Sequence, residues 1–142
     1  MDNVVQVACG WIFNADRTKV LIVNNIGGSW TMPKGAVDVG EYINDVMVRE
    51  AFEETGLHVR VNRLMAISEG FSARKQHKAI FFGFLLEQTD PYQQPSIQIP
   101  DEIAEIKWVD QHELRVLLPW VQFCPWELAE EKNVGFYHSV LP

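Results

Sequence analysis

Apolar and polar positions alternate along much of the chain in the pattern of β-strands. The segments with this alternation, or with many β-branched and aromatic residues, are Val4–Phe13, Lys19–Asn24, Trp30–Met32, Val59–Ile67, Lys78–Leu86 and Ile103–Val109. A short polar turn separates the first two segments, so we expect them to form an opening hairpin. After the third segment, Pro33 and Gly35 predict a loop that runs to about Gly40.

Apolar positions spaced as on one side of a helix mark the remaining segments. Glu41 to Thr55 has this spacing, and Gly56 is placed to end the helix. Near the end, Asp110–Leu118 opens with a capping-box-like Asp-x-x-Glu, and Trp120–Glu131 is amphipathic. Strands on both sides of a central helix, with helices at the end, predict an α/β (α+β) fold in which a mixed central sheet lies between helical layers.

Length and composition limit the kind of protein. The 142 residues suffice for one compact core, so we expect residues 1–142 to form a single domain. With 47% apolar and 22% charged residues, the chain has the balance of a soluble globular protein. The apolar runs are too short to cross a bilayer, and the first residues lack the basic character of a signal peptide. These features predict a cytoplasmic protein without membrane association.

Charge and metal-ligand spacing narrow the chemistry. The net charge of −7 disfavours a broad affinity for DNA or for an anionic membrane, so a polyphosphate substrate would need local cations or a bound metal ion. The four histidines show no ligand-like spacing, and Cys9 and Cys124 lie outside any Cys-x-x-Cys pattern. We therefore expect no zinc site, and we expect both cysteines to be buried free thiols. A metal ion would have carboxylate ligands.

Carboxylates of this kind gather in the stretch Gly35–Leu57, which has the pattern of a loop, a helix and a glycine stop. Glu50, Glu53 and Glu54 stand at positions i, i+3 and i+4 of the expected helix, so their side chains share one face. Like charges at this spacing cost an isolated helix roughly 0.2–0.5 kcal/mol per pair. A solvated acidic face is the alternative, but an all-oxygen cluster also suits a hard cation such as Mg²⁺.

The same stretch resembles the signature of the Nudix hydrolase family. From Gly35 to Leu57 the sequence has glycine, five residues, glutamate, seven residues and then Arg-Glu-aliphatic-x-Glu-Glu-x-Gly-aliphatic. The resemblance implies the family's αβα sandwich with a mixed central sheet. It also implies an enzyme that splits a diphosphate linkage in a nucleotide-like substrate, with Mg²⁺ as the cofactor and Mn²⁺ as the alternative ion.

The resemblance further implies roles for individual residues. The residues that would bind metal ions are Glu50, Glu53, Glu54 and, through its carbonyl, Gly35. Glu41 and Arg49 would pair and brace the loop against the helix. The general base would be one of the metal-binding glutamates or a glutamate from a later segment, for which Glu102 and Glu105 are the candidates. The alternative for Glu105 is an exposed strand residue that alternates with buried neighbours.

The implied reaction is attack by metal-activated water on one phosphorus of a diphosphate bridge, while metal ions neutralise charge on the phosphate oxygens. The expected substrates are nucleoside triphosphates, dinucleoside polyphosphates or nucleotide sugars. One alternative is a catalytically silent Nudix-fold sensor of nucleotides, and another is an enzyme that removes pyrophosphate from RNA 5′ ends. A monomer and a homodimer are both compatible with the sequence.

Candidate substrate-binding residues lie on either side of the signature helix. Lys34 stands in a Pro-Lys-Gly sequence that resembles a variant in family members acting on dinucleoside polyphosphates and other phosphate-rich substrates, and its ammonium group can reach a phosphate. The alternative is that Lys34 is a solvated loop lysine. Arg74 and Lys78 belong to a basic cluster between two predicted strands, although charged loop residues need no ligand. Aromatic candidates for a nucleobase slot, each of which can equally be core, are Trp30, Phe71, Phe81 and Phe82.

Overall fold

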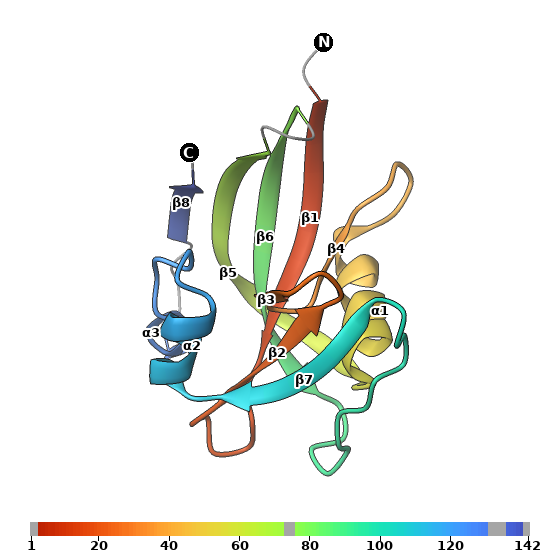
Figure 1. Cartoon of the computed structure of the whole chain (residues 1–142), viewed down its shortest axis with the longest axis vertical. Helices are drawn as coiled ribbons and strands as arrows, with labels where there is room; N and C mark the ends of the chain where they lie inside the picture. The colour runs from red at the N-terminus through yellow and green to blue at the C-terminus, as the bar shows by residue number, and fades with distance from the viewer. Residues whose placement is uncertain (1–2, 73–75, 131–135, 141–142) are drawn as a thin grey trace.

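In a computed structural model, the chain forms two β-sheets that lie between helices (Figure 1). The structure describes residues 3–72, 76–130 and 136–140. The strands are β1 (Asn3–Ile12), β2 (Val20–Asn25), β3 (Ser29–Thr31), β4 (Lys34–Ala36), β5 (Val59–Ser72), β6 (His77–Gln88), β7 (Ile103–Val109) and β8 (Phe136–Val140). The helices are α1 (Ile43–Thr55), α2 (Gln111–Leu117) and α3 (Pro125–Glu130).

The strands are divided between a five-stranded mixed sheet, in the order β4-β1-β6-β5-β8, and a three-stranded sheet, in the order β3-β2-β7. Strand β1 pairs with β4 on one edge and with β6 on the other. Because both edges of β1 are taken, β2 passes into the second sheet. The expected opening hairpin is therefore wrong apart from a single bridge between Phe13 and Val20.

Alternation of side chains along the strands produces two apolar cores. In β1, Cys9 and Trp11 contact the core that α2 and α3 cover, whereas Ala8 and Ile12 contact the core that α1 covers. Strand β2 divides its side chains between the two cores in the same way. Helices thus flank both sides of the sheets, which is the αβα layering expected from the sequence (Figure 1).

The predicted central helix is confirmed as α1. Its buried residues Val46 and Met47 pack on the β1 side, and the helix also contacts β4 and β5. Gly56 ends the helix in a left-handed conformation with φ of 76°, and its N–H donates to the carbonyl of Phe52 at 2.7 Å. This packing fixes the rotation of α1 and turns its acidic face toward the edge strand β4.

Several boundaries differ from the sequence prediction for identifiable reasons. Strand β4 lies inside the expected loop, because it exists through pairing with β1 rather than through a local pattern. Strands β5 and β6 extend further than predicted and shorten the connection between them. In the segment Trp120–Glu131, helix begins only at Pro125, since a proline disfavours helix at the residue before it. The sequence pattern did not predict β8.

The helices on the other side of the sheets are short. The side chain of Asp110 accepts a hydrogen bond from the N–H of Glu113 at 2.9 Å, so the predicted cap of α2 is confirmed. The Glu113 carboxylate does not complete a capping box, because it pairs with Lys107 at 2.6 Å. Across the described ranges, every helix is too short or too polar to span a membrane.

Candidate active site

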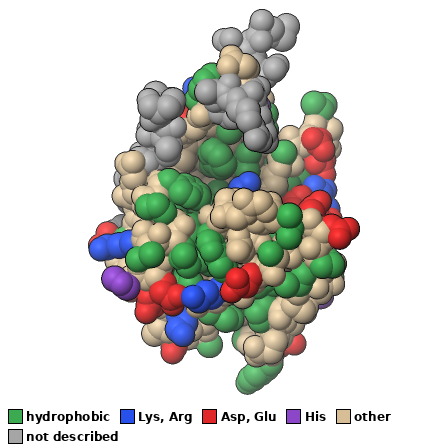
Figure 2. Space-filling model, in the orientation of Figure 1, with side chains coloured by type: hydrophobic (Ala, Val, Ile, Leu, Met, Phe, Trp, Pro, Cys, Tyr) green, Lys and Arg blue, Asp and Glu red, His purple; other side chains and the backbone are tan. Residues whose placement is uncertain are grey.

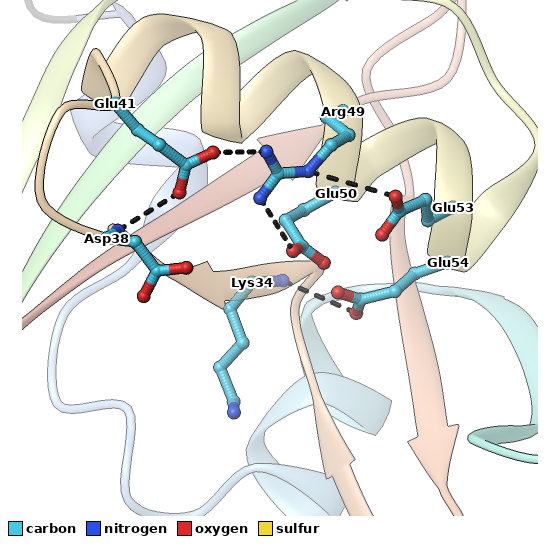
Figure 3. Close-up of polar contacts among 7 residues, drawn as sticks. All are labelled: Lys34, Asp38, Glu41, Arg49, Glu50, Glu53 and Glu54. Atoms are coloured by element: carbon cyan, nitrogen blue, oxygen red, sulfur yellow. Dashed lines mark hydrogen bonds and ion pairs between the residues drawn. The ribbon is translucent and has the colours of Figure 1, made fainter.

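Glu50 and Glu54 lie beside each other where α1 passes β4, and Glu41 and Glu53 both contact Arg49 (Figure 3). Pairing of β4 with β1 holds the backbone of Lys34 against the helix, and the Lys34 N–H donates to the Glu54 carboxylate at 3.4 Å. A Cβ atom at position 35 would overlap the carboxyl group of Glu50. Glycine at position 35 therefore leaves the space that the Glu50 side chain occupies.

Glu50 and Glu54 form a close carboxyl pair that is largely shielded from solvent. Glu54 is only 6% exposed. Burial, followed by the hydrogen bond and the negative charge of Glu50, raises the pKa of Glu54 to about 9. Burial also raises the pKa of Glu50. At neutral pH the pair therefore retains a proton unless a cation takes its place.

Glu53 is oriented differently from its two neighbours. Its side chain is 41% exposed, and its Oε1 lies 3.8 Å from Nε of Arg49. The three glutamates share one helix face, as the spacing predicted, but their carboxyl groups do not converge. Over the described residues, no group of three or more His, Cys, Asp or Glu side chains is already arranged to hold a metal ion.

The Glu50–Glu54 pair nevertheless fits a hard divalent cation. Mg²⁺ is commonly bound by one or two carboxylates, and water and substrate phosphate complete its coordination. A cation between the two carboxyl groups would also relieve the repulsion that keeps a proton on Glu54. Glu50 and Glu54 are therefore the residues that would hold the ion, and Glu53 could join them by leaving Arg49.

Arg49 connects the loop before α1 to the glutamates on the helix. Its Nη1 pairs with Oε2 of Glu41, and its Nη2 lies 3.5 Å from Oε1 of Glu50. Oε1 of Glu41 in turn accepts a hydrogen bond from the N–H of Asp38 at 3.0 Å. These hydrogen bonds, first from Arg49 and then from Asp38, lower the pKa of Glu41. The Glu41–Arg49 contact expected from the sequence is present (Figure 3).

Arg49→Lys is expected to lower kcat/KM by roughly 10–100-fold, the usual effect of losing a group that orients ligands of a metal ion. A lysine keeps the charge but cannot reach Glu41, Glu50 and Glu53 together. Steady-state kinetics would measure the loss. The control is Arg60→Lys, which alters an exposed pair with Glu87 between the neighbouring strands β5 and β6. Equal kcat/KM in the two variants would exclude a positioning role for Arg49.

Lys34, the lysine of the Pro-Lys-Gly sequence, contacts Glu54 through its backbone N–H rather than through its side chain. Figure 3 shows the ammonium group of Lys34 directed away from Glu50 and Glu54. Lys34 is paired with Cys9 across the β4–β1 ladder, so its side chain lies on the sheet face opposite α1. Its position between the carboxyl pair and that face suits contact with a phosphate that spans the edge of the sheet.

The remaining sequence candidates lie elsewhere. Lys78 is engaged by Glu69, with Nζ and Oε2 3.1 Å apart, so it is not the open cation that its cluster suggested. Trp30 is half-buried and packs against the core beneath α2 and α3. Glu105 is exposed on β7, where it pairs with Asn24 of β2, and its role as a base stays a prediction. Arg74 lies outside the described residues.

A cavity of about 220 Å³ lies on the sheet face opposite α1. Its lining includes Phe71 and Phe81, two of the aromatic candidates, whereas Phe82 packs on the α1 side. Figure 2 shows hydrophobic side chains gathered over the region of β6 in the orientation of Figure 1. The lining residues that sequence reasoning missed include Cys9, Trp11, Gly83, Trp120 and Phe123. Only the strand order brings these residues together, so no local signal in the sequence could have found the cavity.

Both cysteines are free thiols, as predicted. Cys9 is buried at the cavity, and burial raises its pKa to about 12, so its thiol is neutral. Cys124 is only half-buried, which corrects the expectation that both thiols are enclosed. The Cys9 thiol is therefore not a candidate for a thiolate nucleophile.

Comparison with known proteins shows which family this chain resembles. The NUDIX domain family matches residues 3–130. Nudix hydrolase 6 of Arabidopsis thaliana is 31% identical over 146 aligned positions, which cover 89% of this chain and 49% of that protein. Nucleoside diphosphate-linked moiety X motif 6 of Mus musculus is 37% identical over 73 positions, which cover 49% of this chain and 21% of that protein. The chain thus spans half or less of the length of these relatives.

Solved structures show the same fold. A crystal structure of an ADP-ribose pyrophosphatase from Streptococcus suis superposes with a TM-score of 0.71 and covers 94% of this chain and 98% of that one. The two sequences are 20% identical, so the likeness concerns the fold alone.

Proposed function

Because the chain belongs to the NUDIX domain family, we propose that it hydrolyses a diphosphate linkage in a nucleoside diphosphate-linked substrate, with Mg²⁺ as the cofactor and Mn²⁺ as the alternative. The substrate would be a nucleoside triphosphate, a dinucleoside polyphosphate or a nucleotide sugar. The observation that carries the proposal is the shielded Glu50–Glu54 carboxyl pair beside β4, which retains a proton in the absence of a cation.

Different side chains of the site would have different roles in such a reaction. Divalent ions bound at the pair would supply positive charge to the phosphate oxygens and lower the pKa of water. Glu50 and Glu54 would bind the ions. Arg49 would hold the loop before α1 against the acidic face of the helix through its contacts with Glu41 and Glu50. Glu53, which is the most exposed of the three glutamates, would accept a proton from the attacking water once it leaves Arg49. Glu105 is the alternative base.

Lys34 would guide the phosphates between two sides of the sheet. Its backbone N–H contacts Glu54 on the α1 side, while its side chain shares the opposite face with Cys9. A phosphate chain that crosses the β4 edge would pass the ammonium group before it reached the carboxyl pair. In a chain of net charge −7, such a local cation helps to offset repulsion of a polyphosphate.

The affinity for Mg²⁺ is expected to increase with pH. Glu54 has a pKa of about 9 and faces Glu50 and the Lys34 N–H, so an ion must displace a proton below that pH. The apparent association constant should rise roughly tenfold per pH unit between about pH 6 and 9 and then level off. Titration calorimetry in several buffers would record both the affinity and the released proton. A constant affinity over this range, without proton release, would contradict Glu54 as a ligand.

The substrate class is tested with a panel of nucleoside triphosphates, dinucleoside polyphosphates, ADP-ribose, other nucleotide sugars, and capped or triphosphorylated RNA. Release of phosphate and nucleotide is measured with Mg²⁺ and with a chelator. Cleavage of one class of small nucleotides only with Mg²⁺ supports the proposal and identifies the substrate class. Selective cleavage of triphosphorylated RNA would instead favour an RNA 5′-pyrophosphohydrolase.

A nucleotide sensor is the second candidate function. The observation in its favour is that Glu53 pairs with Arg49, and the described side chains contain no ready group of three metal ligands. A sensor would bind a nucleotide from the panel without releasing any product under either condition. Nucleotide binding without Mg²⁺-dependent product release would therefore contradict the proposed hydrolase and support the nucleotide sensor.

A further inference from the structure

The end of α1 that carries Glu54 is held by a segment from outside the helix. The helix ends one residue after Glu54, and the connection between β6 and β7 passes along that end (Figure 1). The last carbonyl groups of a helix have no partner within the helix. Here the carbonyl of Thr55 accepts a hydrogen bond from the N–H of Ser96 at 2.7 Å. The carbonyl of Gly56, the residue after the helix, accepts from Nε2 of Gln93 at 3.0 Å.

The side-chain amide of Gln93 uses both its donor and its acceptor on this short stretch of backbone. Besides the hydrogen bond to Gly56, its Oε1 accepts from the N–H of His58 at 3.0 Å. Leu57, the residue between these two contacts, is fully buried in the core that α1 covers. Gln93 therefore binds the chain directly after the helix as a neighbouring strand would, and the buried leucine anchors the same stretch in the core.

Gln93 is itself held in a turn. Its N–H donates to the carbonyl of Asp90 at 3.1 Å, and its carbonyl accepts from Nε2 of Gln88 at 3.1 Å. At the start of the turn, the N–H of Thr89 donates to the carbonyl of His58 at 2.9 Å. A side chain that is supported in this way presents its polar group at a fixed place.

The same segment packs against Gly56 without a gap. A Cβ atom at position 56 would lie 2.5 Å from Oγ of Ser96 and 2.8 Å from its carbonyl oxygen. Both distances are too short for a real Cβ atom, so this close approach requires glycine in addition to the positive φ of the helix end. The end of α1 and residues 89–96 therefore form one packed unit.

Glu54 depends on this attachment more than Glu50 does. Glu50 lies one turn earlier in α1, where helical hydrogen bonds continue on both sides, whereas Glu54 belongs to the last turn, and helix ends fray. Two carboxyl groups must keep a fixed separation if they are to share a cation. Affinity for a metal ion falls when the groups that orient its ligands are removed.

We infer that Gln93 is a positioning residue for the reaction, because its amide holds the last turn of α1 and with it the carboxyl group of Glu54. The inference rests on the proposed function for the role of Glu54 as a metal ligand. Gln93 acts through Glu54 and not by contact with the ion. It extends the site from α1 to the connection between β6 and β7, 37 residues beyond Gly56.

Binding of Mn²⁺ in the absence of substrate tests the inference, since electron paramagnetic resonance distinguishes the free ion from the bound ion. Gln93→Met keeps a side chain of similar length but lacks both the donor and the acceptor, so the Kd for Mn²⁺ should rise roughly tenfold. The spectrum of the bound ion should also change, because Glu54 is displaced relative to Glu50. Gln93→Asn keeps an amide on a side chain too short to reach both groups, so its Kd should lie between those of wild type and Gln93→Met.

Two controls separate positioning from a general loss of stability. Gln94→Met makes the same replacement at the next residue, which is exposed and whose side chain has no hydrogen bond to a described residue. Gly27→Ala strains a turn at a glycine with φ of 105°. Both controls should bind Mn²⁺ with wild-type affinity and give the wild-type spectrum, even though Gly27→Ala lowers the thermal midpoint. Circular dichroism at the temperature of the titration would show that each variant is folded.

Wild-type affinity for Mn²⁺ in both Gln93 variants would overturn the inference. An equal loss of affinity in Gln94→Met or Gly27→Ala would also overturn it, because the effect would then not belong to the Gln93 amide. Failure of the proposed function gives different results. A wild-type protein that does not bind Mn²⁺ would refute the proposed cation site, and one that binds Mn²⁺ but releases no product from the substrate panel would refute the hydrolysis alone.

Discussion

Glu54→Gln is expected to lower kcat by roughly a thousandfold or more, which corresponds to about 4 kcal/mol of transition-state stabilisation. Glutamine has the same shape and can still accept the hydrogen bond from the Lys34 N–H, but it cannot supply the charge that a cation needs. Steady-state kinetics with the substrate found in the panel would measure the loss. Circular dichroism would show whether the fold is retained.

The same substitution is expected to stabilise the metal-free protein at alkaline pH. The pKa of Glu54 is raised from 4.5 to about 9 in the folded state, so the folded chain binds a proton that the unfolded chain releases. The associated stability is fully present below pH 4.5 and is lost as the pH rises toward 9. At pH 8, Glu54→Gln should therefore unfold with a free energy higher by on the order of 2 kcal/mol.

Denaturant unfolding at pH 5 and pH 8, with a chelator present, measures this effect. The difference between wild type and variant should be larger at pH 8 than at pH 5. Wild-type kcat in the variant would exclude Glu54 as a metal ligand. A variant that is less stable than wild type at pH 8 would show that the carboxyl group is not held protonated in the folded chain.

Gly35→Ala is expected to reduce kcat by roughly a hundredfold, because a misplacement of about 1 Å in a positioned group can have this effect. The added methyl group would overlap the carboxyl group of Glu50 and force it away from Glu54. The backbone of Gly35 does not require a positive φ, so strain of the main chain is not the cause. Kinetics and the Mg²⁺ affinity would both be measured.

Gly27→Ala provides the matched control for a glycine substitution. Gly27 has φ of 105° and no atom within contact distance of an added Cβ, so alanine there strains the turn without touching the carboxyl pair. It should lower the thermal midpoint and leave kcat unchanged. Gly35→Ala should instead lower kcat and leave the thermal midpoint unchanged. Normal Mg²⁺ affinity and kcat in Gly35→Ala would show that Glu50 has room to move without loss of function.

The parts of the site that are local in sequence were predictable. Helix spacing placed Glu50, Glu53 and Glu54 on one face of α1, and the end of the helix at Gly56 follows from glycine's left-handed conformation. The contact between Glu41 and Arg49 was expected from the family pattern and is present. These features depend on the period of a helix and on short-range geometry, which the sequence contains directly.

Features that depend on distant pairing were not predictable. Strand β4 forms only because β1 offers an open edge, and its pairing places Lys34 opposite Cys9. The orientation of the Glu53 side chain toward Arg49 is a choice among rotamers that spacing does not determine. The cavity at Trp11 requires the order β1-β6-β5, in which strands far apart in the chain become neighbours.

The most direct test of Glu50 and Glu54 as the cation site is the rate of product release from the substrate panel at increasing Mg²⁺ concentration, measured at pH 8 for wild type and Glu54→Gln. We expect release by the wild-type protein that depends on Mg²⁺ and saturates, and release by the variant that is slower by roughly a thousandfold or more at every Mg²⁺ concentration. Mg²⁺-independent release, or equal release by both proteins, would contradict a role for this carboxyl pair in the reaction.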